Sequence, residues 1–297
     1  MGNPVYGSIR RLIAITSCKG GVGKSTVSAN LAFRLAARGH RVGLFDADVQ
    51  GPSLPTQLPG VQDTKVRLGN RGWSVEPLIY EGVKLMSFGW FAASWGVENG
   101  EVRGSAAPLA TQLLHTTEWG ELDYLIIDSP PGTGDVPKAI ATRIPLHGAV
   151  VVTTPSSLAV VDVVRGVHML TRLNVPIMAV VENMSSFRCP GCESEHYPFG
   201  RGHLDEVLGA IGNEEGGGGG AAVASFRLPI VPAADDVDQA VISEASNMVP
   251  HFEEIAAAIE GAAAVNDQAV SLPDKQKLAY HDMPHWPTIL ATNELFR

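Results

Sequence analysis

The chain has 297 residues, enough for one large α/β domain or two smaller ones, and its content of 45% hydrophobic and 18% charged residues is typical of a globular protein. The formal net charge is −9 and no run of lysine or arginine occurs, so we expect neither a nucleic-acid partner nor a membrane partner. No apolar stretch approaches the ~20 residues that a membrane-spanning helix needs, and we expect no targeting segment in this chain.

The first predicted elements are a strand, a glycine-rich loop and a helix. Residues 12–16 form a short apolar run rich in β-branched side chains, which indicates a strand. Apolar residues recur at helical spacing over residues 27–38, and Gly39 follows in the position where glycine commonly ends a helix. Strand, glycine-rich loop and helix in this order predict a phosphate-binding loop.

The loop itself, residues 17–26, reads Ser-Cys-Lys-Gly-Gly-Val-Gly-Lys-Ser-Thr. Its glycines let backbone N–H groups turn toward a phosphate, and the helix N-terminus favours an anion. Lys24 can reach the β- and γ-phosphates, and the Ser25 hydroxyl is placed to bind Mg²⁺. The residues that we expect to hold the nucleotide in this loop are Lys19, Gly20, Gly21, Val22, Gly23, Lys24, Ser25 and Thr26.

Two acidic residues end the second predicted strand, residues 41–48. They are Asp46 and Asp48. Ligands of open parallel sheets bind at the carboxyl ends of the strands, so we expect both carboxylates to face the phosphates.

The middle of the chain is less regular. The elements predicted there are a loop with weak strands (56–80), a strand (83–88), an exposed loop (89–104) and a helix (106–116). Trp90 and Trp95 in the exposed loop are candidates either for ordinary packing or for a partner surface.

Another acidic residue ends the continuous apolar strand predicted over residues 123–128. A buried parallel strand that ends in Asp128 is the arrangement of a Walker B aspartate. The string Pro-Pro-Gly-Thr-Gly-Asp follows at residues 130–135.

An asparagine follows the last central strand. Residues 149–153 and 176–181 are predicted strands, and residues 158–173 are the helix between them. Asn183 comes just after the second of these strands. An amide there can hydrogen-bond adenine with both its donor and its acceptor, although an Asx-turn is the alternative role for such an asparagine.

Repeated strand–helix–strand units predict the fold class α/β, a mostly parallel doubly wound sheet flanked by helices, here with a deviant Walker A P-loop. We expect residues 1–262 to form one P-loop ATPase domain and residues 263–297 to form an unassigned C-terminal tail. Within the domain we expect a glycine-rich surface insert (214–220), an outer strand (227–230) and a closing helix (248–259).

A Cys-Pro-Gly-Cys turn, Cys189 to Cys192, places two thiols close together. Such a pair suits iron or zinc but supplies only two of the four ligands that Zn²⁺ or a [4Fe–4S] cluster requires. Two copies of the chain related by a two-fold axis would complete the set. Alternatively, His196 and His203 complete a zinc site within one chain, or the two cysteines form a thioredoxin-like redox pair.

These segments together resemble a known family. The strings KGGVGKST, DADVQGPSLP, DSPPGTGD, VENM and CPGC occur in the same order in the Mrp/NBP/Ind-type P-loop ATPases, the carriers of iron–sulfur clusters within the MinD/ParA-like superfamily. The resemblance runs from about Leu12 to Ile259. Three further segments, SCKGGVGK, TTEWGELDY and YPFG, are similar to the HCF-type plastid scaffold branch of that family.

The resemblance implies a role for individual residues. Lys19 would reach across a dimer interface to the partner's nucleotide, Asp48 would position the attacking water, and Asn183 would bind adenine. Residues 130–135 would be a switch that moves after hydrolysis. The expected catalytic residues are Lys19, Lys24, Asp48 and Asp128, and those expected around Mg²⁺ are Ser25, Asp46 and Asp128.

The implied activity is a slow ATPase that acts as an iron–sulfur scaffold or carrier. It would bind ATP and Mg²⁺, form a homodimer that holds a labile [4Fe–4S] cluster at Cys189 and Cys192, and transfer the cluster to apo iron–sulfur proteins. Three cysteines, an odd number, favour a reducing compartment, which we expect to be the cytoplasm or an organelle, either the plastid stroma or the mitochondrial matrix.

Two other classes of protein share parts of this pattern. A MinD/ParA-like regulatory switch with structural Zn²⁺ at the cysteine pair is the alternative, but it requires a basic terminal helix or a basic face. Residues 248–259 contain Glu253 and Glu254 and no lysine. Reductases of the nitrogenase iron-protein kind place their cluster cysteines singly and far apart, unlike this pair.

Overall fold

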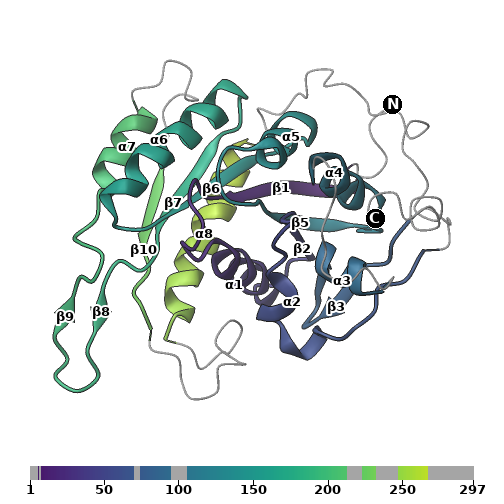
Figure 1. Ribbon diagram of the computed structural model, residues 1–297, viewed down its shortest axis with the longest axis horizontal. Coiled ribbons are helices and arrows are strands. Elements are labelled where there is room, and N and C mark those ends of the chain that lie inside the picture. Colours follow the sequence, from purple (N-terminus) through teal and green to yellow (C-terminus); the bar gives the residue numbers. More distant parts are fainter. Residues whose placement is uncertain are drawn as a thin grey trace.

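The structure is a computed structural model of the chain, shown in Figure 1. It describes residue 6 and residues 8–69, 74–94, 106–212, 223–231 and 247–266. None of the helices in these ranges is long and apolar enough to cross a membrane.

An eight-stranded sheet forms the centre, in the order β10-β7-β6-β1-β5-β2-β4-β3. The strands of this sheet are β1 (Ile9–Thr16), β2 (Val42–Asp46), β3 (Leu78–Tyr80), β4 (Val83–Ser87), β5 (Leu122–Asp128), β6 (Gly148–Thr153), β7 (Ile177–Glu182) and β10 (Ala224–Arg227). All neighbouring strands are parallel except β3 and β4, which are antiparallel. The predicted α/β class with a mostly parallel sheet is therefore confirmed.

Helices cover both faces of the sheet (Figure 1). They are α1 (Lys24–Ala37), α2 (Leu54–Gln57), α3 (Phe88–Ser94), α4 (Ala106–Thr116), α5 (Asp135–Arg143), α6 (Ser157–Arg172), α7 (Leu204–Gly212) and α8 (Val249–Asn266), with a short 3₁₀ turn at Pro59–Val61. In Figure 1, α4 and α5 lie above β1 and α1 lies below it. The central strands are buried on both faces, which is why they read as continuous apolar runs.

Helix α8 is fixed to α1 by ion pairs. Arg38 contacts Glu253 and Glu260, in each case at 2.7 Å, and His40 contacts Glu260 at 2.7 Å. The predicted closing helix is confirmed but is longer than expected, since α8 continues past Gly261 through a run of alanines, the best helix-forming residue. Glu253 and Glu260 therefore hold α8 against the rest of the domain.

The prediction of an exposed loop over residues 89–104 is wrong for residues 89–94. Residues 88–94 form helix α3, and Trp90 is only 1% exposed, so ordinary packing is its role. Gly89 permits this packing because a Cβ there would lie 2.9 Å from Cγ of Pro55 in α2. Trp95 lies outside the part of the chain that the structure describes.

The outer strand is at the predicted edge of the sheet but begins and ends earlier than expected. It is β10, residues 224–227, beside β7, and not residues 227–230. Pro229 has no N–H to donate to a strand ladder, so regular pairing ends before it. The glycine-rich insert at 214–220 lies outside the described residues.

Candidate nucleotide and metal sites

The predicted phosphate loop lies between the end of β1 and the start of α1. Gly21 and Gly23 have φ angles of 75° and 80°, a left-handed conformation that side-chain-bearing residues rarely adopt. Gly23 is the N-cap of α1, and Val27 N donates to its carbonyl at 3.0 Å. Unpaired N–H groups of the helix N-terminus therefore face the loop, as anion binding requires.

Lys24 and Asp128 form a buried ion pair at the centre of the site. Lys24 Nζ lies 2.6 Å from Asp128 Oδ1, and the two side chains are 7% and 1% exposed. Ser28 Oγ donates to the same oxygen at 2.8 Å, and Lys24 Nζ also donates to Ser25 Oγ at 3.2 Å. The structure thus brings together the end of β5 and the start of α1 as the sequence predicts.

The second oxygen of Asp128 fits a Mg²⁺ region. Oδ2 is buried and has no hydrogen-bond partner among the described residues. A buried carboxylate oxygen left without a partner is costly, and Mg²⁺ or a Mg²⁺-bound water is the kind of group that satisfies it. Ser25 Oγ, another predicted Mg²⁺ ligand of this region, is close by, because Lys24 Nζ contacts both Ser25 Oγ and Asp128 Oδ1.

Asp46 is occupied by the protein itself. Its carboxylate, fully buried, accepts hydrogen bonds from the backbone N–H groups of Asp48 (3.0 Å), Ser53 (3.1 Å) and Leu54 (3.2 Å) and from Ser87 Oγ (3.0 Å). Burial, followed by the nearby Asp128 carboxylate, raises the pKa of Asp46 to about 7. These four bonds show that Asp46 shapes the segment after β2, and its predicted place near the metal remains a prediction.

The segments that follow β2 and β5 contain Asp48 and the predicted switch, residues 130–135. Asp48 is partly exposed, and its Oδ1 accepts a hydrogen bond from Gly51 N at 3.0 Å. Gly132, with φ 87°, donates its N–H to Ser17 O at 2.8 Å, so the segment after β5 is tied to the phosphate loop. Lys19 is exposed, in agreement with an outward-directed role.

Asn183 lies against the phosphate loop. Its Nδ2 donates to the Val22 carbonyl at 2.9 Å, and its Oδ1 accepts from Met184 N at 3.0 Å. The sequence predicts adenine recognition by this residue but gives no sign of the contact with Val22. Adenine binding remains a prediction.

Cys18, the third cysteine, belongs to the phosphate loop. In the structure its Sγ packs against helix α6, and a Cβ built on Gly166 would overlap it. Burial raises the pKa of Cys18 to about 11. A raised pKa disfavours the thiolate form of Cys18, whereas the pKa of Cys192 is lowered.

The cysteine pair lies at the tip of a hairpin that projects from the sheet, formed by β8 (Phe187–Arg188) and β9 (Glu195–His196) (Figure 1). Cys189 is half-buried and Cys192 is exposed. Cys189 N donates to Ser194 O at 3.0 Å, which closes the turn. Hydrogen bonds from Ser194, then from Cys189 and His196, lower the pKa of Cys192 to about 7. Two accessible thiols, one of them acidified, fit half of a four-thiolate iron site.

The structure does not assemble the zinc set within one chain. His203 Nδ1 lies 2.9 Å from Glu206 Oε1 in α7, where it is engaged away from the hairpin tip. Among the described residues, no three His, Cys, Asp or Glu side chains gather in a way that would hold a metal ion. Among these described residues, the cysteine pair thus has no third ligand beside it.

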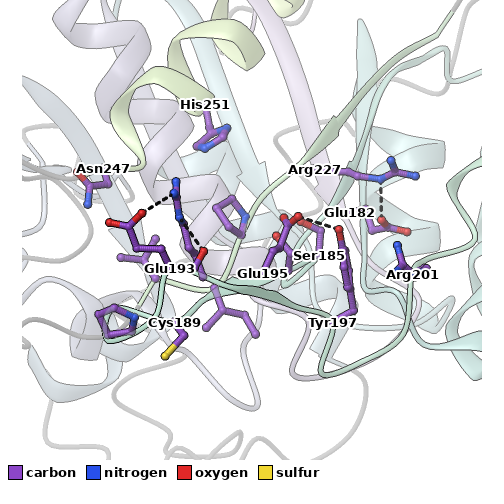
Figure 2. Close-up of a pocket in the computed structure, with 16 residues that line it drawn as sticks. Glu182, Ser185, Cys189, Glu193, Glu195, Tyr197, Arg201, Arg227, Asn247 and His251 are labelled. Carbon is purple, nitrogen blue, oxygen red and sulfur yellow. Dashed lines mark hydrogen bonds and ion pairs between the residues drawn. The ribbon is translucent and has the colours of Figure 1, made fainter.

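A cleft of about 1000 Å³ lies between the hairpin and the sheet edge (Figure 2). Its charged groups are largely paired with one another: Arg188 with Glu193 at 3.4 Å and Arg227 with Glu182 at 3.2 Å. Cys189 lines this cleft. In Figure 2 the sulfur of Cys189 points away from the other labelled side chains of the cleft.

Both ends of the hairpin are tied to the sheet. On the β8 side, Ser185 N and Ile230 N donate to Leu228 O (2.9 Å) and Ser186 O (2.6 Å). On the β9 side, the buried Glu182 carboxylate accepts from His203 N at 3.3 Å and from Arg227 Nε at 3.2 Å. Glu182 thus anchors the returning strand, a role that the sequence did not indicate.

We expect Glu182→Ala to lower the free energy of unfolding by about 1–3 kcal/mol, because it leaves a partly buried N–H and a guanidinium without their acceptor. Urea unfolding measures this effect. The control is Glu195→Ala, which removes an exposed carboxylate that accepts from Tyr197 at 2.8 Å and is expected to leave the free energy of unfolding nearly unchanged. Equal effects of the two substitutions would rule out the anchoring role.

Comparison with known proteins agrees with this site. The family model described as ParA, NUBPL iron-transfer P-loop NTPase, matches residues 8–259. The chain is 48% identical over 204 residues to the chloroplastic Fe-S cluster assembly factor HCF101 of Arabidopsis thaliana, a match that covers 69% of this chain and 37% of that protein. It is 44% identical over 207 residues to the iron-sulfur cluster carrier protein of Aquifex aeolicus, with 69% and 56% covered. The chain thus spans only part of the length of these relatives.

Solved structures show the same architecture. A nucleotide-binding protein from Archaeoglobus fulgidus, in complex with ADP, is similar with a TM-score of 0.61 and 30% identity, over 87% of this chain and 91% of that one. The cell division ATPase MinD of Pyrococcus furiosus shares the fold, with a TM-score of 0.57 and 23% identity over 84% and 98% of the two chains. Because the family model matches most of the chain and the phosphate loop has the geometry that the family requires, the chain belongs to the NUBPL iron-transfer P-loop NTPases of the ParA group.

Proposed function

We propose that this chain is a slow ATPase that carries an iron–sulfur cluster. Two copies of the chain would hold one labile [4Fe–4S] cluster between their Cys189 and Cys192 thiolates and deliver it to apo iron–sulfur proteins. The observation that carries the proposal is the hairpin, which presents two accessible cysteines and lacks further ligands of its own among the described residues. Relatives named as iron–sulfur carriers support the same cargo.

The nucleotide chemistry rests on charge and position. Mg²⁺, when bound, neutralises charge on the β- and γ-phosphates. Lys24, held in place by Asp128, stabilises phosphate charge, and Ser25 and Asp128 would hold the metal. Asp48 orients the attacking water, and Lys19 contributes across the dimer interface. Such positioning is what phosphoryl transfer requires of a protein.

The two sites are joined through the chain. Asn183 contacts the phosphate loop, and the same segment continues directly into β8 and Cys189. The segment after β5 is tied to the loop through Gly132. We propose that these connections let hydrolysis change the affinity of the cysteine pair for the cluster.

The domain boundaries remain predictions. We propose that residues 1–262 are the ATPase domain and residues 263–297 a separate tail. Helix α8 ends at Asn266, so the last turn of the domain's closing helix extends into the proposed tail. The clients are apo iron–sulfur proteins in a reducing compartment of the cytoplasm, plastid stroma or mitochondrial matrix.

Anaerobic reconstitution with iron and sulfide tests the cargo. We expect about four irons per two chains, absorbance from thiolate-to-iron charge transfer, and the mass of a dimer. A colourless protein that retains zinc would instead favour the regulatory ATPase switch with a structural metal. A monomer without metal would contradict the carrier proposal.

A further inference from the structure

The residue after strand β7 reaches back to the phosphate loop. Asn183 Nδ2 donates to the carbonyl of Val22, 161 positions earlier in the chain, at 2.9 Å. The fit is close, because a Cβ placed on Gly23 would overlap the same amide nitrogen. The amide therefore lies directly against the peptide unit that precedes helix α1.

The amide is itself held in one orientation. Its Oδ1 accepts the N–H of Met184 at 3.0 Å, and Met184 has a φ of 59°, in the left-handed region. The Asn183 backbone N–H donates to Thr153 O at 2.8 Å, which continues the β6–β7 ladder. The main chain of Asn183 is thus fixed by the sheet, and its side chain is fixed by the backbone of Met184. The amide donor is therefore already directed at Val22.

This contact determines where one loop N–H points. In a trans peptide the C=O and the following N–H point in opposite directions within one plane. A hydrogen bond that holds the Val22 carbonyl toward Asn183 therefore directs the Gly23 N–H away from Asn183. Gly23 is the N-cap of α1, and backbone N–H groups at such a helix start are the ones that bind phosphate.

We propose that Asn183 is a positioning residue for the phosphate loop: its amide holds the Val22–Gly23 peptide so that the Gly23 N–H points at the bound phosphate. This role rests on the proposed nucleotide binding, but it is separate from any contact with adenine. Its consequence is that Asn183 contributes to the binding of a ligand that has phosphates and no base.

Binding of two ligands distinguishes this role from adenine recognition. Calorimetry would measure the affinities of Mg–ADP and of Mg–tripolyphosphate, which has no base, for the unmodified protein and for Asn183→Ala and Asn183→Leu. Loss of one hydrogen bond that orders the loop is expected to lower the affinity for both ligands by a similar factor, about 3- to 10-fold. Asn183→Leu fills the volume of the amide without its donor, so agreement between the two variants excludes an effect of the cavity.

The control is Asn30→Ala. Asn30 Nδ2 also donates to a backbone carbonyl, that of Thr26 at 2.8 Å, but on the exposed side of α1. This variant is expected to bind both ligands as the unmodified protein does. Weaker ADP binding with unchanged tripolyphosphate binding in the Asn183 variants would overturn the proposal and leave only adenine recognition. Failure of the unmodified protein to bind either ligand would overturn the proposed nucleotide function as well.

Discussion

Lys24→Ala is expected to slow ATP turnover by about 10²- to 10³-fold while two chains still bind about four irons. Lys24 is the loop lysine that we expect to reach the β- and γ-phosphates, and its ammonium lies 2.6 Å from Asp128 Oδ1. Steady-state phosphate release measures the loss of turnover, and iron analysis after reconstitution measures the cargo. A variant that keeps normal turnover would show that the loop does not bind phosphate as proposed.

The same substitution leaves Asp128 buried without its partner. Removal of one member of a buried ion pair costs about 3–5 kcal/mol, so Lys24→Ala is also expected to unfold at lower urea concentration. The double variant Lys24→Ala/Asp128→Asn removes both charges and is the matched control. It is expected to recover stability but not turnover, which separates the chemical role of Lys24 from its structural role.

Cys189→Ala is expected to reduce bound iron from about four per two chains to nearly none, while ATP turnover continues. In the proposed site each chain supplies two thiolates. When both copies carry the substitution, only the two Cys192 thiolates remain, which is half of the ligand set. Iron content and charge-transfer absorbance measure the loss. Full cluster content in this variant would contradict the shared site.

Cys18→Ala is the control for this experiment. It removes the third cysteine, whose thiol is packed against α6 and has a raised pKa. Iron content is expected to stay the same, since this thiol does not reach the hairpin. Equal loss of iron in both variants would show that the cluster depends on the fold and not on Cys189 itself.

The features that the sequence predicts well are those whose signal is local. The strand–loop–helix unit around residues 17–26, the acidic end of β5 and the helix over residues 106–116 each depend on neighbouring residues, and the structure confirms these three elements. The sequence predicts a loop where the structure has helix α3. This helix packs through Gly89 against Pro52 and Pro55, which lie more than 30 positions earlier in the chain. Local propensity carries no information on such a contact.

The site shows the same division. Lys24 and Asp128 could be paired from their motifs, since the carboxyl end of one strand and the start of a helix meet at one edge of a parallel sheet. The contact of Asn183 with Val22 joins two turns that lie 161 positions apart in the sequence, and nothing in either turn predicts the other. The four bonds to Asp46 likewise come from three separate segments.

The packing of Cys18 on Gly166 has a consequence for sequence variation. Glycine in the interior of a helix lowers stability by about 1 kcal/mol relative to alanine. We therefore expect glycine at position 166 only because a Cβ there would overlap Cys18 Sγ. Positions 18 and 166 are therefore expected to change together among relatives. A relative with glycine at position 18, as in the common P-loop pattern, can accept alanine at position 166, whereas one that keeps cysteine cannot. Cysteine in place of glycine at position 18 thus requires glycine at position 166, in a helix distant in the chain.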